Sequence, residues 1–147
     1  MCPNKFAFTL AYAYLRLTMT NVFSIAISSR FEGWWRYNAA LMCGCFDAAD
    51  QRIGFVSAES HVADVGSGLT ARPSEIAPDR RLVLETPPCD HAILYIYVVP
   101  HALPESNDID ATKPFALDLQ IACDGEPLRN EQLPINQWSG ISLELRL

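Results

Sequence analysis

The chain has 147 residues, which is the length of one domain, since domains usually run to about 100–200 residues. Half of the residues are apolar and 19% are charged, a composition that excludes wholesale disorder. The 11 basic residues against 17 acidic ones give a net charge of −6, which argues against a nucleic-acid partner and against docking on anionic membranes.

The first part of the chain alternates between large and small side chains. From Phe6 to Tyr14 the even positions carry aromatic residues or leucine, and the odd positions carry alanine or threonine. A period of two predicts a strand, and Val22–Ser29 predicts a second strand in the same way. The run Phe6–Ser29 contains a single charge, Arg16, and is long enough to span a bilayer. A charge near its middle argues against a span, so we expect two strands of a cytoplasmic protein, with a targeting segment or membrane anchor in residues 6–29 as the alternative.

The rest of the chain holds further strand candidates separated by turn signals. His91–Val99 is apolar on both faces, which predicts a central strand covered on both sides. Glu59–Asp79 carries glycine and proline and predicts a long loop, with a helical turn at Pro73–Ile76. Pro127–Asn136 is polar and is expected to be irregular. The other predicted strands are Trp34–Phe46, Arg52–Ala58, Arg80–Glu85, Phe115–Cys123 and Ile141–Leu147.

About eight short strands with no predicted helix favour an all-β protein. We expect an antiparallel two-sheet β-sandwich formed by residues 1–147 as a single domain. Jelly-roll and C2-like topologies both fit this number of strands, and the sequence does not choose between them.

Aromatic residues beside polar ones provide the first candidate site. Trp34, Trp35 and Arg36 follow one another, and Trp138 lies between Gln137 and Ser139. Tryptophan and arginine are enriched in protein interfaces, and we expect these four residues to anchor a protein partner or a second copy. Neighbouring residues of a strand face opposite ways, so one of the two adjacent tryptophans should lie in the core. Nine arginines against two lysines also fit a subunit of a homo-oligomer or larger assembly.

Acidic loops provide a second candidate, a calcium site. Asp108 and Asp110 lie in one polar loop, and Asp124 and Glu126 flank a turn. Calcium takes several oxygen ligands from loops, so these four carboxylates would form a site if the sandwich brought them together. The alternative function is therefore a loop-based module that binds carbohydrate, by stacking on tryptophan, or calcium.

Two weaker hypotheses concern cysteine and histidine. The five cysteines form no compact disulfide framework, and we expect buried, reduced thiols. Cys43 and Cys45 would bind a soft metal with Cys89 and His91 only if their strands were neighbours. A small hydrolase using His61 and Asp64 is the weakest alternative. The sequence thus favours a non-enzymatic module for protein–protein contact, without a cofactor.

Overall fold

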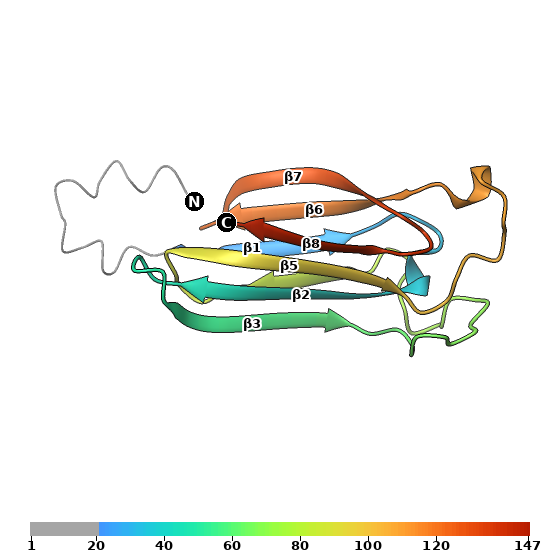
Figure 1. The fold of residues 1–147 in the computed structure, drawn as a ribbon, viewed down its shortest axis with the longest axis horizontal. Coiled ribbons are helices and arrows are strands. Elements are labelled where there is room, and N and C mark those ends of the chain that lie inside the picture. Colours follow the sequence, from blue (N-terminus) through green and yellow to red (C-terminus); the bar gives the residue numbers. More distant parts are fainter. Residues whose placement is uncertain (1–20) are drawn as a thin grey trace.

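Two four-stranded antiparallel sheets pack face to face in the computed structural model, which describes residues 21–147 (Figure 1). One sheet has the order β4-β1-β6-β7 and the other the order β3-β2-β5-β8. The predicted all-β sandwich is therefore confirmed. The strands are β1 (Phe23–Ser28), β2 (Tyr37–Phe46), β3 (Arg52–Ser60), β4 (Arg81–Glu85), β5 (His91–Pro100), β6 (Phe115–Cys123), β7 (Glu126–Ile135) and β8 (Ile141–Arg146).

Alternation along each strand builds the core between the sheets. β6 buries every second residue from Phe115 to Cys123, and β2 and β5 also bury alternate residues, odd-numbered ones in β2 and even-numbered ones in β5. Because successive strand residues point to opposite faces, the apolar parity of each strand turns inward and is removed from water. The largest fully buried side chains are Phe23, Ile25, Ile27, Trp34, Tyr37, Leu41, Leu94, Ile96, Leu117, Leu119, Ile121 and Ile135.

Three sequence predictions need correction. β7 occupies the segment that was expected to be irregular. Trp34–Arg36 forms a short 3₁₀ helix, η3, so β2 begins only at Tyr37. β5 lies between two strands of its sheet, but its outer face is only half-buried, because nothing in residues 21–147 covers that face. The predicted strand Phe6–Tyr14 lies outside the described residues.

The connections divide the molecule into two different ends. Figure 1 shows the loop between β3 and β4, the loop between β5 and β6, and η3 at one end. We call this the loop end. The opposite end carries the β2–β3 hairpin and the tight β6–β7 turn. In the long loop the amide of Ile76 donates to the carbonyl of Pro73 at 3.1 Å, which agrees with the predicted turn.

Candidate functional site

Trp34 lies in the core and offers no surface to a partner. It is 1% exposed, and its indole N–H donates to the carbonyl of Arg80 at 3.1 Å. The Arg80 guanidinium stacks on the indole ring at 4.3 Å from its centroid. The expectation that Trp34 anchors an interface is therefore wrong for the described chain, while the expectation that one tryptophan of the pair is core holds.

Arg80 is a half-buried cation held by two main-chain carbonyls and a serine hydroxyl. Its Nη1 donates to the Trp34 carbonyl at 2.9 Å, its Nε to the Ser60 hydroxyl at 2.8 Å, and its Nη2 to the Tyr37 carbonyl. Burial lowers the pKa of Arg80 to about 10, which leaves the side chain charged at neutral pH. Arg80, at the end of the loop between β3 and β4, thus connects that loop to η3 and to the start of β2.

The other three sequence-predicted residues gather at the loop end. Trp35 and Arg36 are half-buried, and Trp138, 39% exposed, lies in the turn that joins β7 to β8. An Arg36 Nη2 donates to the Oε1 of Gln137 at 3.2 Å, which ties η3 to that turn. Gln137 is fixed in turn, since its carbonyl accepts from the Tyr37 hydroxyl at 2.6 Å.

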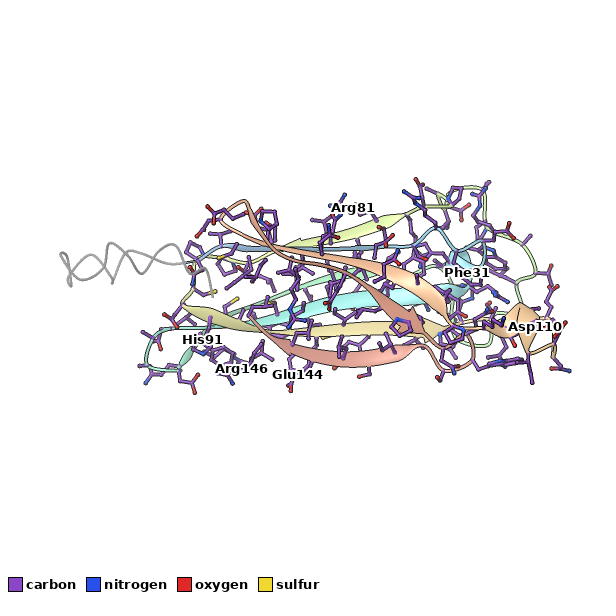
Figure 2. The ribbon with its side chains drawn as sticks, turned by 90° about the horizontal axis from the view of Figure 1, so that it is seen from above. Phe31, Arg81, His91, Asp110, Glu144 and Arg146 are labelled. Carbon is purple, nitrogen blue, oxygen red and sulfur yellow. The ribbon has the colours of Figure 1, made fainter. Side chains whose placement is uncertain are left out.

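A cleft of about 430 Å³ opens beside Arg36 at the loop end. We call it the Arg36 cleft. Phe31, labelled in Figure 2 at this end, stacks on Phe115 with ring centroids 4.5 Å apart. A Cβ placed on Gly33 would lie 2.5 Å from Arg36 Nη2 and 2.6 Å from the Phe31 ring. Only glycine therefore lets the guanidinium and the ring approach this backbone so closely.

The four carboxylates of the predicted calcium site do not come together. Asp108 and Asp110 precede β6 at the loop end, where Figure 2 labels Asp110, whereas Asp124 and Glu126 flank the turn after β6. The nine residues of β6 separate the two pairs by roughly 30 Å at the usual rise per residue. Among residues 21–147 no group of three His, Cys, Asp or Glu side chains is placed to hold a metal ion. The shared calcium site is therefore wrong.

Histidine and serine meet in a pair that the sequence did not indicate. His101 is buried, with Nδ1 at 2.8 Å from the Ser67 hydroxyl and Nε2 at 2.7 Å from the Trp35 carbonyl. A carbonyl only accepts, so Nε2 carries the proton and Nδ1 accepts from Ser67. Burial lowers the pKa of His101, which favours this neutral form. The pair fastens the long loop to the end of β5. His61 instead lies 3.3 Å from Asp64 on the surface.

Three cysteines form a buried thiol cluster between β2 and the start of β5. Cys43, Cys45 and Cys89 are free and buried, whereas Cys123 is disulfide-bonded, so the expectation that all the cysteines are reduced thiols is wrong. Cys45 hydrogen-bonds with both of the other free thiols. Burial raises the pKa of Cys43 and Cys89 to about 12, so both remain protonated thiols. The strands are neighbours, as a metal site would need, but His91 stacks on Phe46 with centroids 5.2 Å apart on the opposite face of the sheet. The Cys₃His set therefore does not form.

The outer face of the β3-β2-β5-β8 sheet carries apolar side chains that face solvent. Phe55 is 53% exposed, and the strand registers place it beside Gly44 and Ile93 in one row across the sheet. Met42 and Tyr95 pair in the next row. We call this surface the β3-β8 face. The sequence did not indicate it, because apolar residues on both faces of β5 predict burial on both sides.

Comparison with known proteins adds a distant structure. No protein-family model matches the sequence, and no curated protein matches it. A DUF4425 family protein from Bacteroides ovatus aligns over 88% of this chain and 94% of its own, with 8% identity and a TM-score of 0.38. A likeness this weak carries no argument about function. Within residues 21–147, no helix has the length and apolar character needed to cross a membrane.

Proposed function

We propose that this protein is a non-enzymatic module that works through protein–protein contact, and that a second copy of the chain covers the β3-β8 face. The observation that carries the proposal is the exposure of Phe55 among apolar neighbours on the outer face of the sheet. Aromatic side chains and methionine are enriched in interfaces, and contiguous exposed apolar surface marks sites of association. Cys43, Cys45 and Cys89 are free thiols but Cys123 is disulfide-bonded, so the cysteines do not favour a reducing compartment.

The charges at both rims of this face favour a second copy as the occupant. On β3, Arg52 pairs with Phe46 and Glu59 pairs with Ala40. Counting rows of paired residues across the sheet, Arg52 lies three rows to one side of the row that contains Cys43, and Glu59 lies three rows to the other side. On β8, Arg146 and Glu144 flank the same row, because Leu145 pairs with Leu94 and Leu94 with Cys43.

A two-fold axis through this row makes the surface complementary to itself. A copy turned by half a rotation about an axis lying in the sheet plane, across the strands, sets β3 against β3 and β8 against β8. Arg52 of each copy then faces Glu59 of the other, and Arg146 faces Glu144. Reciprocal contacts of this kind define an isologous dimer interface. Phe55 and its apolar neighbours lie between the two charged rims.

Light scattering after size exclusion, at two protein concentrations, tests the proposal. We expect a dimer whose dissociation constant rises by about tenfold in Phe55→Ser, since a large apolar contact is lost. Val83→Ser is the matched control, because Val83 is also 53% exposed but lies on β4 in the other sheet. A chain that stays monomeric at about 100 µM overturns the proposal.

Charge reversal tests the orientation of the two copies. Arg52→Glu and Glu59→Arg should each weaken the dimer, because each places like charges opposite one another twice. The double variant Arg52→Glu/Glu59→Arg should restore it, because the pairs are re-formed with exchanged signs. Additive weakening in the double variant contradicts this arrangement.

A further inference from the structure

Among residues 21–147, Arg36 is a cation without a carboxylate partner. Gln137 accepts from one of its N–H groups, and the guanidinium lies over the Phe31 ring at 5.7 Å from the centroid. Its Nε is buried and has no hydrogen-bond partner among the described residues. In the part of the chain that the structure describes, no ion pair involves Arg36. A buried N–H donor without an acceptor is costly, and in native structures such a group marks an ordered water, an ion, local strain or a functional role.

The walls of the Arg36 cleft are apolar beside this cation. Phe31 and Trp35 contribute aromatic rings, and Leu69 and Leu103 contribute aliphatic side chains. Leu103 is 58% exposed and Leu69 38%, so both present apolar surface at the cleft to solvent. The cleft therefore offers a guanidinium next to a surface that favours burial of an apolar group.

We propose that the Arg36 cleft binds a carboxylate carried on an apolar body. A single guanidinium matches the planar, two-oxygen geometry of one carboxylate, and an apolar body of the ligand would cover Trp35 and Leu103. Two sources share this chemistry: a small aromatic or aliphatic carboxylic acid, and the C-terminal residue of a peptide. The site goes beyond the proposed dimer and lies at the loop end, away from the β3-β8 face.

Two carboxylates at the cleft limit what it accepts. Glu32 and Glu105 contribute to its lining, and both are exposed to solvent. Together with Arg36 they are the charged side chains of the lining. A phosphate dianion would be repelled by both glutamates and attracted by one arginine, whereas a monoanion with an apolar body is opposed less and gains the apolar contacts.

The first experiment titrates the intact chain with 3-phenylpropionate and with its uncharged amide. Two-dimensional NMR follows the indole N–H signal of Trp35. We expect a dissociation constant of about 1 mM for the acid, typical of so small a ligand, and at least about tenfold weaker binding of the amide. N-acetyl-Ala-Phe with a free C-terminus and its C-terminal amide form the peptide arm. Tighter binding of the free-acid peptide than of 3-phenylpropionate identifies a peptide C-terminus as the source, and the reverse order identifies a small acid.

Variants separate the site from the fold. Arg36→Gln should weaken binding of 3-phenylpropionate by about tenfold, while Arg129→Gln on the exposed strand β7 should leave it unchanged. The double variant Glu32→Gln/Glu105→Gln keeps the arginine and removes two negative charges beside the ligand carboxylate, so it should tighten binding at low salt by about twofold. This variant tests the site even if Arg36→Gln does not fold. Equal affinities for acid and amide, no binding at about 10 mM, or weaker binding in the glutamate variant overturns the proposal. None of these results depends on dimerisation, which Phe55→Ser weakens separately.

Discussion

Replacing Arg80 with glutamine should destabilise the protein more than the same replacement at any other arginine of residues 21–147. Its guanidinium stacks on Trp34 at 4.3 Å from the ring centroid, a partly desolvated contact worth about 1–2 kcal/mol. It also donates to the carbonyl of Tyr37. The pairing of β2 with β3 starts at Ala39 and Ser60, so this carbonyl lies beyond that ladder. Leaving it without a donor costs about 1–3 kcal/mol.

Together these losses predict a destabilisation of about 3 kcal/mol in Arg80→Gln, or a fall of about 10 °C in melting temperature for a chain of this size. Urea unfolding followed by tryptophan fluorescence measures the change in unfolding free energy. The matched control is Arg81→Gln, because Arg81 is the next residue but is exposed on β4, and we expect a change within about 0.5 kcal/mol there. A loss of less than about 1 kcal/mol in Arg80→Gln would show that the stack and the carbonyl contacts are replaceable by water.

Three further predictions concern histidine, cysteine and calcium. Burial lowers the pKa of His101, so the unfolded chain takes up a proton more readily than the folded chain, and stability should be full above about pH 6.5 and fall as the pH drops below that value. His101→Gln should flatten this pH dependence, whereas His61→Gln, on the surface, should not. An unchanged slope in His101→Gln would contradict the assignment. Cys43, Cys45 and Cys89 should resist iodoacetamide at pH 8 in the folded protein and react with it in denaturant. Peptide mapping measures the labelling of each cysteine. Rapid labelling of the folded protein would mean that the cluster opens. Millimolar calcium should leave the melting temperature unchanged because the acidic loops lie at opposite ends of β6, and a rise reversed by chelator would disprove that placement.

Much of the fold was accessible from the alternation of side chains. β6 matches its predicted bounds, Phe115–Cys123, because one parity is apolar throughout. β7 was missed for two physical reasons. It is an edge strand, where prolines such as Pro127 and Pro134 are tolerated. The register also shifts between Ile121 and Ala122. Leu128 and Leu133 therefore both pack against the core, although they are an odd number of residues apart and would face opposite sides of a regular strand.

The candidate site was only partly accessible from the sequence. The density of aromatic and polar residues drew attention to Trp35 and Arg36, and the structure places both at one cleft. Their link to Gln137 depends on a contact across about a hundred residues, which no local pattern reveals. Trp34 looked identical to Trp35 in sequence, and only the turn of η3 decides which ring enters the core.

The strand order also has a consequence for the newly synthesised chain. β1 pairs with β6 in a register that joins Phe23 to Cys123, so one of its two neighbours lies 100 residues downstream. At about 5–20 residues per second, a ribosome needs about 5–20 s to deliver that neighbour. During this interval the uncharged segment Phe23–Ser28 is an apolar strand with an open edge, the kind of segment that recruits other chains. The yield of folded protein should therefore depend on how well the cell shields β1 until β6 has been made.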